Sequence, residues 1–215
     1  MALLLPFTST TWASAVPDVQ RVLANHCVLA LPTETFYGLG VRPTDESALQ
    51  RLHRVKGRPS DKAILLLIGR RDQLSGLVAS IPPAAAVLMD RFWPGPLTLI
   101  FPAAPELSLL LTAGTGTIGV RLPPIPHLQE LLHVVGPLTG TSANRSSEPP
   151  LDAADDVQRA LGADVDLILD GGRTPGGSAS TLVDTRGTPR LLRPGALPTE
   201  PVRAALAAAG YALSS

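Results

Sequence analysis

Cysteine is nearly absent from this 215-residue chain, which has only Cys27. A single cysteine excludes an internal disulfide, zinc sites of the CxxC type and iron–sulfur clusters held by cysteines. Histidine does not fill the gap, because His127 and His133 lack the i, i+4 spacing of a zinc-binding helix. We therefore expect no transition metal, and the low cysteine content favours a cytoplasmic protein.

Charge is also scarce. Charged residues make up 17% of the chain, and 18 basic side chains balance 18 acidic ones. A neutral chain has no global attraction to nucleic acid or to an anionic membrane, and an aromatic content of 4% leaves few rings on which bases could stack. We therefore expect weak or no direct RNA binding, and any anion site must be local.

Long apolar runs are missing as well. No run approaches the roughly 18 residues that a membrane span needs. Pro6 cuts the apolar N-terminal stretch to five residues, and no basic residue precedes it. We therefore expect neither a secretory leader nor an association with membranes.

The chain does have enough apolar material for a core, since 45% of its residues are hydrophobic. The pattern predicts strands at 27–32, 63–69, 97–101, 117–123, 166–172, 180–185 and 190–194, and one more that opens the segment 137–144. It predicts helices at 18–25, 45–55, 82–93, 125–134, 152–162 and 204–209. No repeat or long linker divides the chain. We predict an α/β fold in a single domain, residues 1–215, built on one mixed or partly parallel sheet.

Both lysines of the chain lie in one short segment, HRVKGRPSDK (53–62). The five cations in and before it are Arg51, Arg54, Lys56, Arg58 and Lys62. Such a run is most often a solvated helix face. A loop that turns through a glycine and a proline could instead aim Lys56 and Arg58 at one polyphosphate, which suits a mixture of point charge and planar fork. The chain has no Walker or GxGxxG motif, so neither a P-loop nor a Rossmann site is expected.

Four polar clusters each follow an apolar run: PTET (32–35), GVRLP (119–123), TSAN (141–144) and GGSAST (176–181). Each taken alone could be an ordinary turn or loop. Arg121 is the exception, because a guanidinium within an apolar strand needs an anionic partner. Loops beyond strand ends converge in open α/β sheets, so we expect these clusters to meet at one ligand site.

The motifs PTETFYGLG, KGRPSDK, WPGPLTLI, GVRLP, TSAN, STLVD and LLRPG follow one another along the chain. In this order and spacing the chain resembles the YrdC/TsaC family over about residues 18–195. The resemblance implies a YrdC-like domain with a twisted mixed β-sheet, flanking helices and a positively charged concave groove. It implies a nucleotidyltransferase that forms threonylcarbamoyl-AMP and pyrophosphate from L-threonine, bicarbonate or CO2, and ATP. The product would serve threonylcarbamoyladenosine modification of tRNA in the cytoplasm, together with partner proteins of that pathway.

The same resemblance assigns the site residues. Lys56 and Arg58 would be catalytic and would hold the ATP phosphates, and the remaining ATP contacts would be Thr117, Ser142, Asn144 and Arg193. The threonine contacts would be Thr33, Tyr37, Arg121, Thr141 and Ser180. Mg2+ would arrive on the ATP phosphates, with no metal site made by the protein alone.

The chain departs from the family pattern at three places. Ala63-Ile64 replaces a common Pro-Leu, Leu67 stands near the place of a histidine in some longer relatives, and Ser147 replaces a glycine. With about twenty residues after LLRPG, we expect the short bacterial form of the family. Two other functions stay open at this stage: an RNA-binding ribosome- or tRNA-associated factor without catalysis, and a carbamoyl-adenylate-forming domain that uses carbamoyl phosphate.

Overall fold

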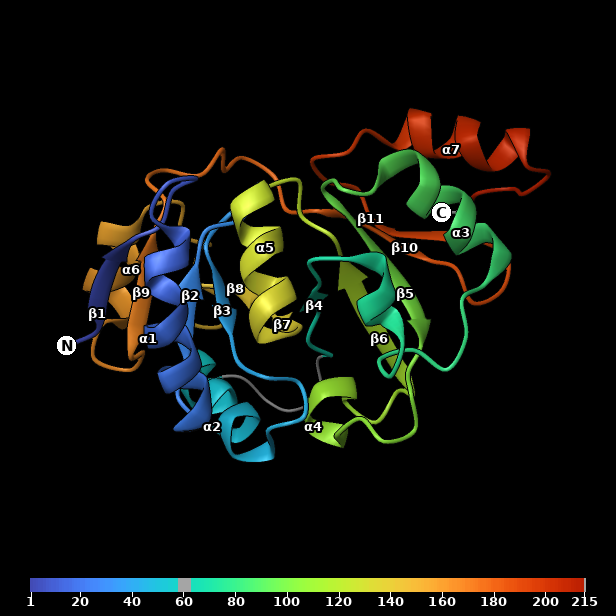
Figure 1. The fold of residues 1–215 in the computed structure, drawn as a ribbon. Coiled ribbons are helices and arrows are strands. Elements are labelled where there is room, and N and C mark those ends of the chain that lie inside the picture. Colours follow the sequence, from blue (N-terminus) through green and yellow to red (C-terminus); the bar gives the residue numbers. More distant parts are fainter. Residues whose placement is uncertain (58–62, 215) are drawn as a thin grey trace.

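The structure, a computed structural model, describes residues 1–57 and 63–214 and contains two β-sheets with helices packed around them (Figure 1). The predicted α/β class is confirmed. The predicted single sheet is wrong, because the strands divide between two sheets.

The first sheet has the strand order β1-β9-β2-β3-β8. Its strands are β1 (Leu3–Pro6), β9 (Leu167–Asp170), β2 (Leu29–Leu31), β3 (Gly38–Gly40) and β8 (Thr141–Ser142). The first three run parallel, whereas β3 is antiparallel to both of its neighbours. The N-terminal apolar run, in which no strand was predicted, therefore forms an edge strand.

The second sheet has the strand order β11-β10-β5-β6-β4-β7. Its strands are β11 (Arg190–Arg193), β10 (Thr181–Asp184), β5 (Leu97–Pro102), β6 (Thr117–Arg121), β4 (Leu66–Leu67) and β7 (Leu138–Thr139). Only β10 with β5, and β4 with β6, run parallel. The strand predicted at 63–69 is thus much shorter than its apolar run.

The helices are α1 (Trp12–Ala24), α2 (Glu46–Lys56), α3 (Pro83–Phe92), α4 (Leu109–Thr112), α5 (Pro126–Val135), α6 (Ala154–Leu161) and α7 (Thr199–Ala208), with a 3-10 turn at Arg71–Leu74. Helix α1 packs against α5, and α3 packs against α7. Within the described residues, no helix has the length and apolar character needed to cross a bilayer.

Helix α1 begins six residues before the predicted start at Asp18. Pro17, the residue before the predicted start, lies inside the helix. Proline removes one backbone hydrogen bond and costs about 3 kcal/mol in a helix interior. Four residues of α1 are buried (Ala15, Val19, Val22 and Leu23), and packing of this face supplies the compensating stability.

The chain crosses from one sheet to the other within five residues. Residues 138–139 form β7 in the second sheet, and 141–142 form β8 in the first. Gly140 lies between them, where a Cβ atom would be 2.6 Å from Cγ of Leu67. A glycine is therefore required for the two sheets to approach at this point.

Candidate functional site

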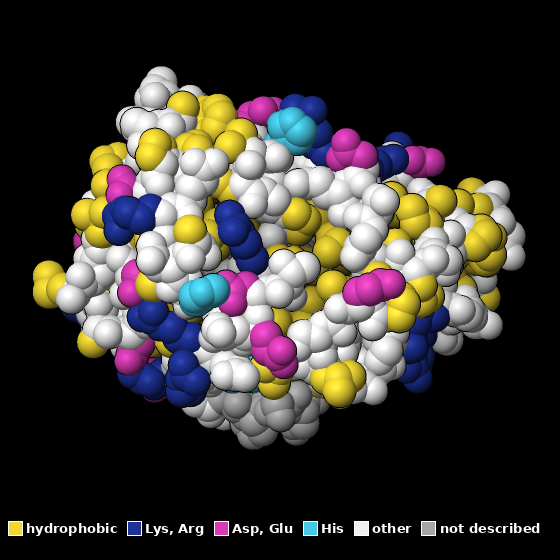
Figure 2. All heavy atoms as spheres, turned by 60° about the horizontal axis from the view of Figure 1, so that its bottom comes forward, with side chains coloured by type: hydrophobic (Ala, Val, Ile, Leu, Met, Phe, Trp, Pro, Cys, Tyr) yellow, Lys and Arg dark blue, Asp and Glu magenta, His cyan; other side chains and the backbone are white. Residues whose placement is uncertain are grey.

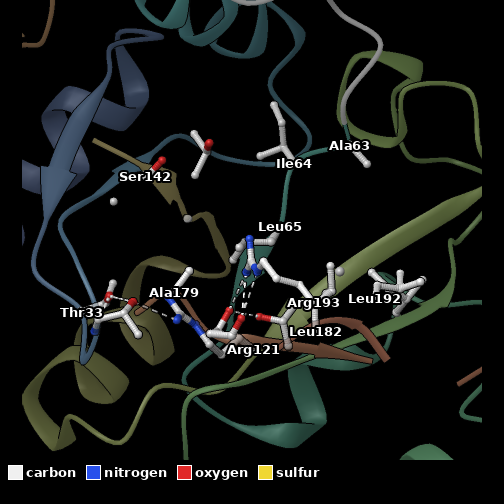
Figure 3. A pocket seen from close by; sticks show the side chains of 18 of the residues that line it. Thr33, Ala63, Ile64, Leu65, Arg121, Ser142, Ala179, Leu182, Leu192 and Arg193 are labelled. Atoms are coloured by element: carbon white, nitrogen blue, oxygen red, sulfur yellow. Dashed lines mark hydrogen bonds between the residues drawn. The ribbon is translucent and has the colours of Figure 1, made fainter. Parts of the chain in front are cut away.

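A cavity of about 610 Å³ lies between the two sheets (Figure 3). One face of the second sheet contributes much of its lining, through Thr98 and Ile100 of β5, Thr117, Gly119 and Arg121 of β6, and Leu182 and Asp184 of β10. The residues between them, such as Leu99, Val120 and Val183, are fully buried in the core. The two-residue period of a strand thus separates a ligand face from a core face.

The first sheet and the turn after β2 supply the other wall. The lining residues from this part are Thr33, Thr35, Phe36, Tyr37, Gly38, Thr141 and Ser142. In Figure 3, Ser142 lies on the far side of the hollow from Arg121 and Arg193. The cavity therefore needs both sheets, and neither alone would enclose it.

Lys56 is the last residue of α2 and is 4% exposed. Its Nζ donates hydrogen bonds to the backbone oxygen of Ser142 at 2.6 Å and to Oδ1 of Asn144 at 2.8 Å. Ser142 Oγ also donates to that Asn144 oxygen at 2.6 Å. The three residues form one connected group, and Ser142 carries it to the cavity wall.

The placement of Lys56 follows from the ends of its helix. The Asp45 side chain accepts from the Ala48 backbone N–H at 3.0 Å and caps α2. Gly57 ends the helix in the left-handed conformation, at φ 55°, where glycine is favoured. The helix thereby stops with Lys56 pointing at the segment 142–144.

Arg121 of β6 is 3% exposed and has the anionic partner that the sequence predicted. That partner is Glu34, whose Oε1 lies 2.9 Å from Nη1 of Arg121. The same Nη1 donates to Oγ1 of Thr35 at 3.2 Å. Burial raises the pKa of the Glu34 carboxyl above its usual value, although the nearby Arg121 charge acts in the opposite direction.

Arg193 of β11 lies on the same side of the cavity and is held by Ser180. Its Nη2 donates to the Ser180 backbone oxygen at 2.8 Å, and Ser180 Oγ is hydrogen-bonded to Oγ1 of Thr98 at 2.8 Å. Burial, and secondly repulsion from Arg121, lowers the pKa of Arg193. Two arginines thus lie close enough to influence each other.

Tyr37 is fully buried, and its hydroxyl donates to the Gly172 backbone oxygen at 2.7 Å. Burial is the main cause that raises the pKa of Tyr37 to about 12, so the phenol is neutral at physiological pH. The hydroxyl ties the turn after β2 to the loop after β9.

Most of the predicted site residues meet in this cavity. Those that line it are Thr33, Tyr37, Thr117, Arg121, Thr141, Ser142, Ser180 and Arg193. Lys56 and Asn144 are not lining residues but contact Ser142. Arg58 and Lys62 lie outside the described residues.

The run of cations around Lys56 does not converge as a whole. Arg51 pairs with Asp166 at 2.9 Å and donates to Sγ of Cys27, so it belongs to the packing of α2 against the first sheet. Figure 2 shows positive and negative side chains interspersed over this side of the molecule. Of the described cations in the run, Lys56 is the one that contacts the cavity wall.

The three family departures have different positions. Ala63 and Ile64 line the cavity. Leu67 is fully buried and does not line it, whereas Leu65 does. Ser147 has φ 72°, a left-handed conformation that explains why relatives use glycine there.

Several residues in and around the cavity were not predicted from the sequence. Asp184, Arg186 and Arg190 line the end of the cavity away from Arg121. Arg186 donates to both carboxylate oxygens of Asp184, at 3.0 and 2.7 Å. The i, i+2 spacing of this pair at the end of a predicted strand was the signal that could have found it. Glu34 was also missed, although it lies within the motif PTET.

The chain is similar in sequence and in fold to several known proteins. The family model described as "Telomere recombination", of the Sua5, YciO and YrdC proteins, matches residues 21–195. The threonylcarbamoyl-AMP synthase of Pyrococcus abyssi is 40% identical over 81% of this chain and 52% of the relative. This chain therefore spans about half the length of that relative. The threonylcarbamoyl-AMP synthase of Thiobacillus denitrificans is 36% identical over 86% of this chain and 98% of its own length.

A solved structure agrees. The crystal structure of P. abyssi Sua5 complexed with L-threonine superimposes with a TM-score of 0.89 and 33% identity, over 99% of this chain and 62% of that one. The matched region includes both sheets and all the motifs quoted above. The chain therefore belongs to the Sua5/YciO/YrdC family.

Proposed function

We propose that this chain is an L-threonylcarbamoyladenylate synthase, a nucleotidyltransferase that supplies the activated intermediate for threonylcarbamoyladenosine modification of tRNA. The observation that carries the proposal is the shared cavity between the sheets. It brings Ser142, with Lys56 and Asn144 behind it, to face Thr33, Arg121 and Ser180. The names of the relatives support the same activity.

In this proposal the amino acid occupies the end of the cavity around the turn after β2. Arg121 attracts the threonine carboxylate, and Thr33, Thr141 and Ser180 offer hydroxyl groups to its polar atoms. Tyr37 lines this end, with its own hydroxyl already engaged by Gly172. P. abyssi Sua5 forms a crystalline complex with L-threonine, which supports an amino-acid site in the shared fold.

ATP would occupy the remaining length of the cavity. Ser142, Asn144 and Lys56 hold its phosphates together with Arg58, while Thr117 and Arg193 complete the contacts. The lining carries Arg121, Arg186, Arg190 and Arg193 against Asp184, which supports a positively charged groove. Mg2+ comes as part of the substrate, bound to the phosphates.

The chemistry needs no covalent intermediate on the protein. The threonine amine attacks CO2 and loses a proton to give a carbamate; when bicarbonate is the reactant, the amine proton leaves with a bicarbonate oxygen as water. A carbamate oxygen then attacks the α-phosphorus of ATP, and the bond to the pyrophosphate oxygen breaks. No histidine or cysteine lines the described cavity, so the proposed catalysis rests on holding two anions together and stabilising the growing phosphate charge.

We also propose that residues 1–215 act as one domain, since the cavity is lined by both sheets. We further propose that this domain acts in the cytoplasm. The product would pass to partner proteins of tRNA modification. Direct tRNA binding is expected to be weak, because charges of both signs alternate on the face shown in Figure 2.

The test is product formation by the purified chain. Threonylcarbamoyl-AMP and pyrophosphate should appear only when ATP, threonine and bicarbonate are all present. ATP turnover with carbamoyl phosphate in place of threonine and bicarbonate would identify a carbamoyl-adenylate-forming domain instead. Tight RNA binding without any ATP turnover would identify an RNA-binding factor and contradict the proposal.

A further inference from the structure

Glu34 is the most heavily shielded carboxylate at the amino-acid end of the cavity. Its side chain is 10% exposed, and among the described residues neither carboxylate oxygen accepts a hydrogen bond. Within residues 1–57 and 63–214, its close charged contact is Arg121, at 2.9 Å, where the atoms are near enough for an ion pair but not aligned for a hydrogen bond. Burial of a carboxylate costs desolvation free energy, and a role in orienting Arg121 would explain why this one is buried.

The pair joins the two walls of the cavity. Glu34 lies in the turn that follows β2 of the first sheet, and Arg121 ends β6 of the second. Thr35 accepts from the same Arg121 nitrogen at 3.2 Å, and its Oγ1 is 3.1 Å from Oγ1 of Thr33. The orientation of Arg121 is therefore set by consecutive residues of a single turn.

That turn is itself held in place. Thr174 donates through Oγ1 to the Thr35 backbone oxygen at 3.0 Å, and the Gly176 backbone N–H donates to the same oxygen at 2.8 Å. Thr33 Oγ1 donates to the Phe36 backbone oxygen at 2.7 Å. Glu34 is thus presented from a fixed backbone, as a positioning group must be.

Three charged side chains lie close together in this part of the cavity. Arg121 and Arg193 bring two positive charges, and Glu34 brings one negative charge. Among the described residues, no other carboxylate pairs with either arginine. Glu34 therefore offsets one of the two positive charges that Arg121, assigned to the amino acid, and Arg193, assigned to ATP, bring to this part of the cavity.

We propose that Glu34 is a positioning residue for the amino-acid substrate: it fixes the Arg121 guanidinium against the turn after β2 and offsets one of the two positive charges that Arg121 and Arg193 bring to this part of the cavity. The role rests on the proposed function and acts through Arg121, since the Glu34 carboxylate is shielded from the cavity. Removal of its charge should leave Arg121 free to turn and should leave two uncompensated arginines side by side. Threonine binding should then suffer more than ATP turnover at saturation.

The experiment compares the parent chain with Glu34→Gln, Glu34→Asp and Glu130→Gln. Glu130 pairs with Arg70 at 3.7 Å on the exposed side of α5, so its variant removes the same charge from a distant pair. With Glu34→Gln we expect the KM for threonine to rise about 10-fold or more, as for loss of a charged contact, with smaller changes in kcat and in the KM for ATP. Glu34→Asp should recover part of the loss, and Glu130→Gln should match the parent. A threonine KM for folded Glu34→Gln equal to the parent value would overturn the proposal.

A second measurement tests the Glu34–Arg121 pair even if Glu34→Gln folds poorly or the parent chain is inactive. The free energies of unfolding of Glu34→Gln, Arg121→Gln and the double variant form a cycle with the parent. The double variant should be more stable than the sum of the two single losses predicts, because it leaves no unpaired buried charge. Strict additivity would overturn the inference. A parent that forms no threonylcarbamoyl-AMP but shows this coupling would overturn the proposed function while supporting the fixed pair.

Discussion

Lys56 combines deep burial with contacts to the Ser142 backbone oxygen and to Asn144 Oδ1. These contacts place its ammonium group next to Ser142, which lines the cavity. The sequence pointed to this residue through the clustering of the chain's two lysines. Its contacts with residues 142–144, about ninety positions later, are a property of the fold alone.

Replacement of Lys56 by alanine should lower threonylcarbamoyl-AMP formation by about 100-fold or more, because one preorganised donor to the developing phosphate charge is lost. The measurement is pyrophosphate release at saturating threonine, bicarbonate and ATP. Arg54→Ala, on the same helix but away from the cavity, is the matched control and should keep the parent rate. Retention of the parent rate by Lys56→Ala would remove this residue from the catalytic group.

Asp184 gives a prediction about pH. Hydrogen bonds from Arg186 are the first cause that holds the pKa of the Asp184 carboxyl below its ordinary value of 3.8. A lowered folded-state pKa contributes stability that is present above the unfolded value and is lost as the pH falls through the folded one. Asp184→Asn should therefore be less stable than the parent near neutral pH, and the difference should shrink once the pH falls below about 3.8. Chemical denaturation from pH 7 to pH 3 measures it, and a difference that grows on acidification would contradict the assignment.

At the scale of elements, the alternation of side chains within single strands separates the site from the core. The segment 117–121 shows it clearly, since Ile118 and Val120 enter the core while Thr117, Gly119 and Arg121 line the cavity. The sheet that each strand joins could not be predicted in the same way. A two-residue period says which side chains share a face, but it does not say which sheet a strand joins. The short strands 138–139 and 141–142 illustrate this, because they are one residue apart and join different sheets.

Local propensity also misled where packing decided the outcome. The helix predicted at 18–25 begins at Trp12 in the structure, and the buried face of α1 outweighs the cost of Pro17 inside it. Glu34 could not be assigned from the sequence, because its role depends on an arginine 87 positions later in the other sheet. The family resemblance located the motif but gave this residue no role.

The crossing between the sheets gives a prediction about an element. Gly140→Ala would place a Cβ atom 2.6 Å from Leu67 Cγ, and overpacking of this kind typically costs about 1–3 kcal/mol. Thermal or denaturant unfolding should show the loss. Gly187→Ala is the matched control, because a Cβ atom there meets nothing within 4 Å, and it should be neutral. Equal stability of the two variants would show that the contact at Gly140 is easily relieved.

The whole molecule offers a test of the shared cavity. Ligands that bind only the folded chain stabilise it by about 2.7 kcal/mol at one hundred times Kd. ATP with Mg2+ and threonine should therefore raise Tm, and the effect of the two together should exceed that of either one. Thr33→Ala should weaken the threonine response and leave the ATP response in place. A Tm that does not respond to either ligand would argue against the cavity as their site.

The crossing between the sheets at Gly140 also affects how far apart the two walls of the cavity lie. The two walls of the cavity belong to separate hydrogen-bonded sheets, and in the proposed arrangement each substrate contacts both of them. A Cβ atom on Gly38 would lie 3.6 Å from the backbone of Gly140, and a Cβ atom on Gly140 would lie 2.6 Å from Leu67 Cγ, so little room is left between the sheets at this point. The spacing of the two walls, and with it the separation of two substrates that contact both, thus depends on residues that touch neither substrate.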